Sequence, residues 1–436
     1  MGKKSDINMF EGKRLLLIGA TSYFIDVIKE ARKMGIVTIV TDFNPNAAAK
    51  KYADIAYDIN TVDKESILQL AIKENVDGIF VAWSDANLYT AQYVCEKLKK
   101  PFYATKEQLD CAVNKDMFKQ MCIRNGVPVT KQYYLDDKFS REDLDKILYP
   151  VIMKPVDNGG SRGVSVCENE EELLSAYKKA MAYSKRGKII VEEYIENKGR
   201  TFSVKYILRD GEPYLLSVGD RKVLNSEKGE ALITSAAVYP AIFTEKYMEK
   251  MDDLTKSMLK NEGFRNGQLF IEGIFDGEEF YFYEMGYRLS GGITYHITDR
   301  LTGINGMRML IKFALKGEMC TILETKKIDP LMNSGAACSF AILMKTGTVT
   351  EIQGLDIIQD MSEVVDITQY YQVGQTVEEK DIGNVGQMFA RLTVIGKTRE
   401  SVADTISKIE ERLHIIDENG NEMFIKTFDT TMIIER

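Results

Sequence analysis

A glycine-rich stretch in the middle of the chain carries its lysine on the N-terminal side. Residues 152–166 read IMKPVDNGGSRGVSV, and Lys154 ends the apolar run that opens them. Three glycines follow it: Gly159, Gly160 and Gly163. In a P-loop the lysine comes after the glycines and begins a helix, whose N-terminus holds the phosphates. Here Pro155 disfavours a helix and residues 164–166 alternate in polarity, so the pattern predicts a strand, a glycine loop and a second strand.

Two glutamates lie on the arms of a predicted hairpin further along the chain. Glu272 and Glu284 stand among apolar and aromatic neighbours on either side of Asp276-Gly277, a dipeptide that favours a tight turn. Carboxylates that face inward from such strands are costly unless a cation satisfies them. A two-residue loop would send them to opposite faces, whereas a three-residue loop or one bulge would let them share Mg²⁺. Two exposed glutamates are the alternative.

The segment after the second glutamate brings a guanidinium close to it. Residues 284–292 read EMGYRLSGG, with Arg288 in the middle and a flexible exit at Gly291-Gly292. An arginine fork beside a metal-binding carboxylate suits a phosphoryl or acyl-phosphate group. His296 follows closely enough to touch a substrate, and a structural histidine is an equally good alternative.

A short helix with complete start and stop signals begins at Lys115. Asn114 is suited to cap its N-terminus, Gly126 follows its end and Pro128 stops it. Lys115 then lies in the first turn, where its charge opposes the helix dipole. Either it is a solvated surface lysine, or it joins the helix N-terminus in facing an anion.

The elements before these motifs predict an open parallel α/β sheet. Residues 14–20, 36–42 and 78–83 are apolar strands separated by helical periods, as in βαβ units. A nicotinamide-binding fold is disfavoured, because the glycine after Gly19 is Gly35 and the G-x-G-x-x-G fingerprint is missing.

The elements after them are mostly strands. Residues 188–199 read KIIVEEYIENKG, an apolar strand that ends in acidic residues. Strand patterns continue from 201 to 285, and short strands return after residue 317, together with an amphipathic helix over 399–412.

Composition limits the classes of protein. The 436 residues are 44% apolar and 28% charged, which is typical of a globular protein with two or three domains. The net charge of −8 argues against binding to nucleic acid. Six cysteines without a CxxC pair predict neither a zinc site nor disulfides, and the charged N-terminus resembles no signal peptide or membrane span. We expect a reduced, cytoplasmic protein with no membrane partner.

In chain order, these motifs resemble the ATP-grasp superfamily. Four of them carry the likeness: Lys115, the Lys154 glycine loop, VEEYI (191–195) and the hairpin with Glu272, Glu284 and Arg288. The resemblance is greatest to the branch with biotin carboxylase, the carbamoyl-phosphate synthetase large subunit and related amino-acid ligases, and it covers nearly the whole chain. It implies an N-terminal open parallel α/β (pre-ATP-grasp) domain over 1–113, an ATP-grasp domain of two β-rich lobes over 114–316 and a small α+β C-terminal domain over 317–436.

The resemblance also implies which residues hold ATP. The nucleotide-binding set is Lys115, Lys154, Gly159, Gly160, Ser161, Gly163, Glu192, Glu193 and Ile195. The two lysines would contact the phosphates, and the last three residues would form the hinge around adenine. Residues 158–163 would close as a lid, and we expect them to be mobile without nucleotide.

Metal ligands and a catalytic arginine follow from the same resemblance. Glu272 and Glu284 map onto ligands of Mg²⁺, which Mn²⁺ could replace, and Arg288 maps onto the arginine that faces the transferred phosphoryl group. The family often has asparagine where this chain has Gly286, so the number of ions stays open. Lys205 lies on a strand outside the motifs and is expected to contribute little to formation of an acyl phosphate.

The implied activity is that of an ATP-dependent carboxylate–amine ligase. A carboxylic acid, which could be an amino acid, would attack the γ-phosphoryl group, and an amine would open the acyl phosphate, releasing ADP and phosphate. A biotin carboxylase-like or carbamoyl-phosphate synthetase-like enzyme is one alternative. A nucleotide-binding regulatory protein without catalysis is another, which Gly286 alone supports. The expected partners are a small-molecule acid and amine, and a homodimer is possible.

Overall fold

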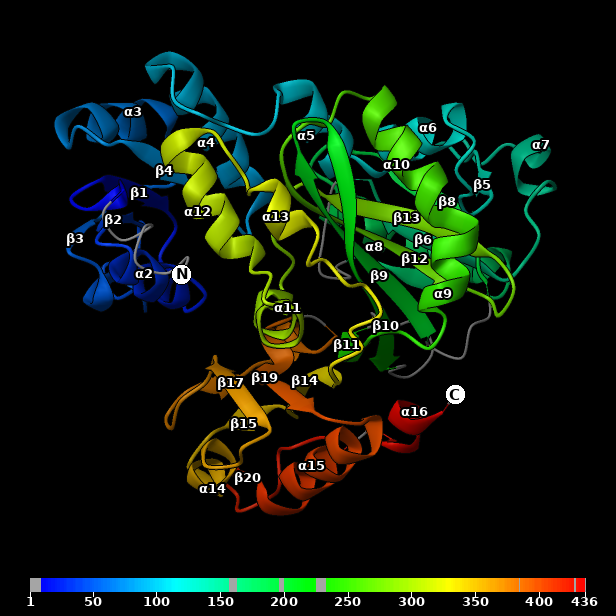
Figure 1. The fold of residues 1–436 in the computed structure, drawn as a ribbon. Coiled ribbons are helices and arrows are strands. Elements are labelled where there is room, and N and C mark those ends of the chain that lie inside the picture. Colours follow the sequence, from blue (N-terminus) through cyan, green and yellow to red (C-terminus); the bar gives the residue numbers. More distant parts are fainter. Residues whose placement is uncertain are drawn as a thin grey trace.

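A four-stranded parallel sheet forms the N-terminal part of the protein (Figure 1). The computed structural model describes residues 9–156, 163–195, 200–224, 233–383, 385–426 and 429–435. The sheet has the order β3-β2-β1-β4 and only parallel pairs. Its elements are β1 (Arg14–Ile18), α2 (Phe24–Lys33), β2 (Val37–Thr41), η1 (Lys50–Tyr52), β3 (Ile55–Tyr57), α3 (Lys64–Lys73), β4 (Gly78–Phe80) and α4 (Asp85–Leu98). The predicted open parallel α/β fold is confirmed.

The central strand β1 is buried on both faces, which explains its uninterrupted apolar run. Leu16 packs with residues of α3 and α4, whereas Leu15 packs on the other face with residues of α2 and of α12 (Gly306–Lys316). Helix α12 approaches β4 so closely that a Cβ on Gly78 would lie 2.3 Å from the carbonyl oxygen of Ala314. This contact fixes the N-terminal sheet against the middle of the chain.

Two antiparallel sheets make up the β-rich lobes of the middle region. The smaller has the order β5-β8-β6-β7. The segment that contains it comprises α5 (Lys106–Val113), α6 (Lys115–Arg124), β5 (Gln132–Tyr133), α7 (Arg141–Leu144), β6 (Val151–Pro155), β7 (Ser165–Cys167), α8 (Glu170–Tyr183) and β8 (Ile189–Glu193). The glycine loop between β6 and β7 therefore joins two paired strands, as predicted. Its residues 157–162 lie outside the described part, and so does the expectation of their mobility.

The larger sheet has eight strands in the order β13-β12-β9-β10-β11-β14-β19-β17. These are β9 (Arg200–Arg209), β10 (Glu212–Leu224), β11 (Ile233–Tyr239), β12 (Gly267–Phe275), β13 (Phe280–Gly286), β14 (Ala336–Leu343), β17 (Val364–Gln369) and β19 (Met388–Gly396). The neighbouring helices are α9 (Thr244–Tyr247), η2 (Met248–Asp252), α10 (Asp253–Asn261), α11 (Thr294–Thr302) and α13 (Ile322–Thr325). Helices α5 and α6 pack against β13 of this larger sheet. Because its last three strands come after residue 316, this sheet crosses one of the domain boundaries, which stay a prediction.

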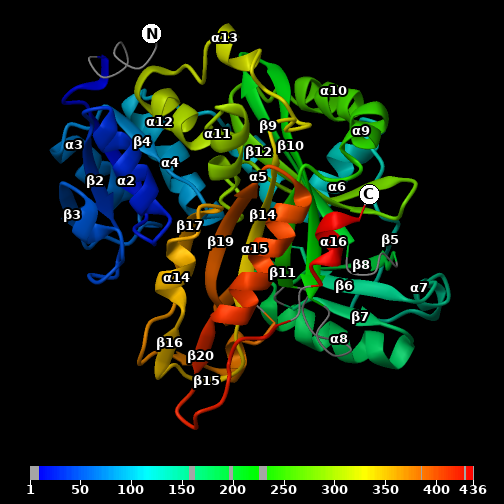
Figure 2. The same cartoon turned by 60° about the horizontal axis from the view of Figure 1, so that its bottom comes forward.

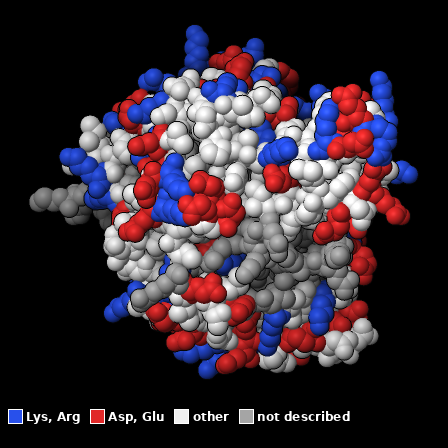
Figure 3. Space-filling model, turned by 90° about the vertical axis from the view of Figure 1, so that its right-hand side faces the viewer, with Lys and Arg blue, Asp and Glu red and all other residues white. Residues whose placement is uncertain are grey.

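The C-terminal part covers one end of that sheet, and Figure 2 shows α15 lying along β14 and β19. Its further elements are β15 (Gly347–Thr348), β16 (Glu351–Gln353), α14 (Leu355–Gln359), β18 (Thr376–Val377), η3 (Glu379–Asp381), η4 (Val385–Gln387), α15 (Arg399–Arg412), β20 (His414–Ile416) and α16 (Thr431–Ile434). Helix α15 has the predicted bounds. Among the described helices, none is long and apolar enough to cross a membrane. Acidic and basic side chains are interspersed over the face in Figure 3.

The hairpin of β12 and β13 contains the bulge that the two glutamates need. Phe275 pairs with Phe280, so the turn has four residues rather than the two or three considered from the sequence. The register then shifts, and Glu272 comes to lie directly opposite Glu284. Because a bulge adds one residue to one strand, it restores the same face to both side chains. The predicted bulge is confirmed.

Candidate functional site

A cleft of about 1330 Å³ opens between the lobes and receives residues from the N-terminal, middle and C-terminal parts of the chain. We call it the central cleft. The candidate residues that line it are Lys115, Lys154, Glu192, Glu193, Ile195, Glu272, Glu284 and Arg288. Gly159, Gly160 and Ser161 lie outside the described residues. Gly163 is described and does not line the cleft; its φ of 77° favours glycine. The structure thus brings eight candidates together.

Lys115 and Glu284 form an ion pair in the cleft. Lys115 is the first residue of α6, whose N-cap Asn114 accepts hydrogen bonds from the backbone of Asp116 and Met117. Its Nζ lies 3.0 Å from Oε2 of Glu284. Burial disfavours the charged carboxylate, but Lys115 and the other cations of the cleft outweigh it and lower the pKa of Glu284 to about 2. Glu284 is therefore ionised at neutral pH.

Glu272 is held by a second cation, Arg221 of β10. The guanidinium contacts Oε2 of Glu272 and donates a hydrogen bond of 3.2 Å to the hydroxyl of Tyr283. Burial raises the pKa of Glu272, Arg221 opposes this, and the charge of Glu284 across the hairpin raises it further. Two facing carboxylates offer the hard oxygen ligands that Mg²⁺ prefers, so this donor set fits the ion.

Lys154 belongs to a buried group of two lysines and one carboxylate. Its Nζ lies 2.6 Å from Oε2 of Glu192, and Lys119 Nζ lies 2.5 Å from Oε1 of the same side chain. Glu192 and Lys119 are each 1% exposed. Both oxygens of Glu192 are thus engaged by lysines, and the group carries a surplus positive charge toward the cleft. Lys119 was not predicted from the sequence, although it follows Lys115 by one turn of the same helix.

Arg288 is positioned by a residue far away in the sequence. Asp85, the first residue of α4, accepts hydrogen bonds of 2.6 Å from Nε and 3.0 Å from Nη2 of Arg288. Ser84 caps that helix and accepts a hydrogen bond from the Asn87 backbone. The guanidinium also lies over the ring of Phe270, 5.2 Å from its centroid. The sequence gave no sign that Asp85 contacts Arg288.

Lys205 does not lie outside the site, as its position in the sequence suggested. It is 2% exposed, lines the central cleft and donates a hydrogen bond of 2.8 Å to the hydroxyl of Tyr239. Burial lowers the pKa of Lys205 to about 7, although the nearby Glu272 acts in the opposite direction. Position 205 is therefore coupled to the electrostatics of the cleft, and the expectation of little effect is corrected.

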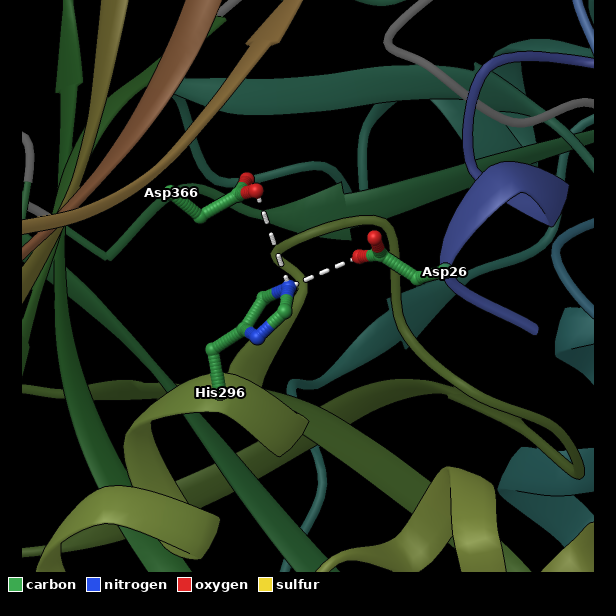
Figure 4. A group of neighbouring side chains, drawn as sticks. All are labelled: Asp26, His296 and Asp366. Atoms are coloured by element: carbon green, nitrogen blue, oxygen red, sulfur yellow. Dashed lines mark hydrogen bonds and ion pairs between the residues drawn. The ribbon is translucent and has the colours of Figure 1, made fainter. Parts of the chain in front are cut away.

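His296 joins three parts of the chain, as Figure 4 shows. From α11, its Nε2 lies 2.8 Å from Oδ2 of Asp26 in α2 and 3.8 Å from Oδ1 of Asp366 in β17. Burial would lower the pKa of His296, but these carboxylates and Asp299 raise it. His296 does not line the central cleft. This geometry links three parts of the chain outside the central cleft.

Comparisons with known proteins agree with this arrangement. Residues 114–322 match the family model "Carbamoyl-phosphate synthase L chain, ATP binding domain". The chain is 26% identical over 322 residues to the 2-oxoglutarate carboxylase small subunit of Hydrogenobacter thermophilus, covering 69% of this chain and 66% of that protein. It therefore spans just under two thirds of that relative's length.

Solved structures show the same fold over most of the chain. The L-amino acid ligase of Bacillus licheniformis superposes with a TM-score of 0.77 at 21% sequence identity. The match covers 94% of this chain and 100% of the ligase chain. The biotin carboxylase domain of the Hydrogenobacter thermophilus 2-oxoglutarate carboxylase, a dimer in complex with MgADP and bicarbonate, gives 0.75 at 20% identity, over 95% and 91% of the two chains. Residues 114–322 are therefore similar to the ATP-binding domain of carbamoyl-phosphate synthase, and the chain shares the fold of these ligase and carboxylase structures over most of its length.

Proposed function

We propose that the protein is an ATP-dependent, ADP-forming ligase that activates a carboxylic acid as its acyl phosphate and joins it to an amine. One observation carries this proposal: the bulged hairpin places Glu272 opposite Glu284 in the same cleft as Lys115, Lys154 and Arg288. Two facing carboxylates beside three cations suit a divalent cation together with a polyphosphate. The solved structure of a relative with MgADP supports the choice of ATP and Mg²⁺.

In the first step, an oxygen of the acid attacks the γ-phosphorus of ATP and the bond to the bridging oxygen of ADP breaks. Lys115 and Lys154 bind phosphate oxygens, and Arg288 stabilises the charge on the transferred group. Asp85 is a positioning residue, because it holds the guanidinium of Arg288 through two hydrogen bonds. Glu272 and Glu284 would hold Mg²⁺, which would supply further positive charge at the phosphate oxygens.

In the second step, the amine nitrogen attacks the acyl carbon, phosphate leaves, and the nitrogen loses a proton.

Glu193 and Ile195 are assigned to the adenine end of the cleft, together with Gly159, Gly160, Ser161 and Gly163 of the covering loop. The division into domains over 1–113, 114–316 and 317–436 is part of the same proposal. All six cysteines are free thiols, which agrees with a cytoplasmic location.

A second candidate is a biotin carboxylase-like enzyme, for which bicarbonate would be the acid. The likeness to the 2-oxoglutarate carboxylase small subunit favours it. The dimer in that protein's solved structure supports the expectation of a homodimer here. Both candidates share the acyl-phosphate step and differ in the acid and the acceptor.

An ADP-release screen with hydroxylamine in place of the amine tests the proposal. The screen covers amino acids, small dicarboxylates and bicarbonate, each with ATP and Mg²⁺. We expect one carboxylic acid to yield a hydroxamate with stoichiometric ADP. ADP release with bicarbonate alone would favour the carboxylase. If no acid elicits ADP while ATP still binds, the protein is a nucleotide-binding protein without this catalysis.

A further inference from the structure

Arg391 is a buried arginine that the proposed chemistry does not use. It lies in the middle of β19, an otherwise apolar strand except for Thr393. Ala390 and Leu392 point into the core beneath α15. Because side chains alternate along a strand, Arg391 points the other way, and it lines the central cleft. It is 8% exposed, so its charge sits largely out of water.

The guanidinium of Arg391 has no carboxylate partner within the described residues. Its Nη1 donates a hydrogen bond of 3.2 Å to Oγ of Ser339, and the group also interacts with the hydroxyl of Tyr370. Its Nε has no hydrogen-bond partner in the described structure. An arginine that is buried and paired only with neutral groups is costly unless an anion joins it. Lys115, Arg221 and Arg288 differ, since each forms an ion pair with a carboxylate, whereas Lys205 resembles Arg391 in that its hydrogen bonds go to hydroxyl groups.

Several other buried polar atoms on described residues of the cleft also lack hydrogen-bond partners, among them Nε1 of Trp83, Oγ of Ser290 and the hydroxyls of Thr90, Thr130 and Thr201. Of these, Trp83 packs on Tyr23, and Ser290 belongs to the loop that Ser339 contacts. Trp83 has a φ of 61°, a conformation that bulky residues rarely adopt and that clusters at binding sites. Its ring stacks on Tyr23 at 5.1 Å, and Tyr23 contacts Tyr370, the neighbour of Arg391.

This part of the cleft adjoins the proposed phosphoryl site through one loop. Arg288 donates a hydrogen bond of 3.1 Å to the carbonyl of Leu289, and Ser339 donates one of 3.0 Å to the carbonyl of Gly292. Tyr23 contacts the carbonyl of Gly291 at 3.4 Å. The residues from 289 to 292 therefore connect Arg288 at one end with the partner of Arg391 at the other.

We propose that Arg391, with Trp83 Nε1 and Ser290 Oγ, forms a subsite for a carboxylate that does not react, carried by the amine substrate. The amine would then be an amino acid, and this inference rests on the proposed ligase. A monoanion matches the single positive charge of Arg391, whereas a phosphate would bring surplus negative charge. The rings of Tyr23, Trp83 and Tyr370 offer a flat apolar wall, which suits an amino acid with an apolar side chain.

Equilibrium binding tests the subsite without turnover. Each of the common L-amino acids and its α-amide is titrated into the protein with Mg²⁺ and a non-hydrolysable ATP analogue, and binding is followed by calorimetry. We expect at least one apolar amino acid to bind roughly 10- to 100-fold more tightly than its amide, the range typical of a lost charge-assisted hydrogen bond. Absence of any amino acid that binds in this way would overturn the proposal.

Variants of Arg391 test whether this residue binds the carboxylate of the amino acid. Arg391→Gln should weaken binding of that amino acid by the same factor and leave its amide unchanged, and Arg391→Lys should give an intermediate loss. Arg141→Gln, an exposed arginine of α7 outside the cleft, is the matched control and should change neither. Equal losses for acid and amide would show a merely structural role, and an amino acid insensitive to Arg391→Gln would be binding through another cation. Either result refutes the subsite.

The two proposals fail in distinguishable ways. ADP release in the hydroxylamine assay without carboxylate-dependent binding of an amino acid would leave the ligase standing and remove the subsite. Carboxylate-dependent binding that requires Arg391, without ADP release for any acid, would remove the ligase and keep the subsite. Should Arg391→Gln fail to fold, the comparison of acid and amide in the unaltered protein and in Arg391→Lys decides the matter.

Discussion

Replacing Glu192 by glutamine should destabilise the protein far more than the small change of shape suggests. The carboxylate lies 2.6 Å from Lys154 Nζ and 2.5 Å from Lys119 Nζ, and it is 1% exposed. Glutamine keeps the volume and removes the charge, which leaves two buried ammonium groups facing each other. The substitution therefore measures whether Glu192 holds the two lysines or instead contacts the adenine, as the sequence resemblance implied.

The expected magnitude follows from the cost of a buried charge. Removing one partner of a buried ion pair typically costs about 3–5 kcal/mol. The loss has a ceiling, because a lysine with an ordinary pKa of 10.5 can release its proton at pH 7.5 for about 4 kcal/mol. We expect the free energy of unfolding to fall by about 3–4 kcal/mol at pH 7.5. In the variant the folded lysines bind protons more weakly than the unfolded ones, so its stability should recover as pH rises.

Urea unfolding of both proteins at pH 7.5 and pH 9.5 provides the measurement. Glu193→Gln is the matched control, since Glu193 is the next residue on the same strand and is exposed. Its effect should stay within about 0.5 kcal/mol. If Glu192→Gln unfolds like this control and loses only nucleotide binding, the ionic role is refuted and the carboxylate acts at the nucleotide.

Three further substitutions test other contacts. Arg288→Ala should lower hydroxamate formation by roughly two to four powers of ten with unchanged ATP binding; an unchanged rate would remove Arg288 from the phosphoryl group. Glu284→Gln should weaken the effect of Mg²⁺ on nucleotide binding by about 10- to 100-fold in calorimetry, whereas Glu279→Gln in the exposed turn should not. Burial lowers the pKa of His296, but Asp26, Asp366 and Asp299 raise it by more, so the pKa lies above 6.5. The unaltered protein should therefore have a larger free energy of unfolding than His296→Gln. This difference should be complete below pH 6.5 and disappear as pH rises through the pKa of His296 in the folded protein. A difference in urea unfolding that is independent of pH would contradict this.

Local patterns predicted the elements that local energetics decide. The apolar run of β1, the caps of α6 and the bounds of α15 follow from residues a few positions apart. The bulge in the hairpin could be predicted only on the condition that Glu272 and Glu284 face the same side of the sheet. The four-residue turn was not foreseen, because its order comes from Asp276, whose Oδ1 accepts hydrogen bonds from the backbone of Glu278 and Glu279.

Contacts between distant segments could not be predicted in the same way. Asp85 and Arg288 are 203 residues apart, and tertiary contacts such as the hydrogen bonds between Tyr103 and Tyr287 bring their segments together. Lys205 and Arg391 did leave a signal, since each is a cation in the interior of a largely apolar strand. Such a residue is either at an edge in solvent or buried in a site, and the order of strands in the sheet decides which. That order was not readable from the sequence.

Four charges at the proposed metal site are arranged as two ion pairs that a magnesium nucleotide can replace. Lys115 pairs with Glu284, and Arg221 pairs with Glu272. In each pair a carboxylate proposed to bind the metal meets a cation of the same cleft, so that both are compensated before any ligand arrives. A polyphosphate alone would draw Lys115 away and leave Glu284 buried without a counter-charge, which is costly. A divalent cation arriving with the phosphates compensates both at once, because it meets the carboxylates while the phosphates meet the cations. The pairing therefore favours the joint binding of metal and nucleotide over either one separately.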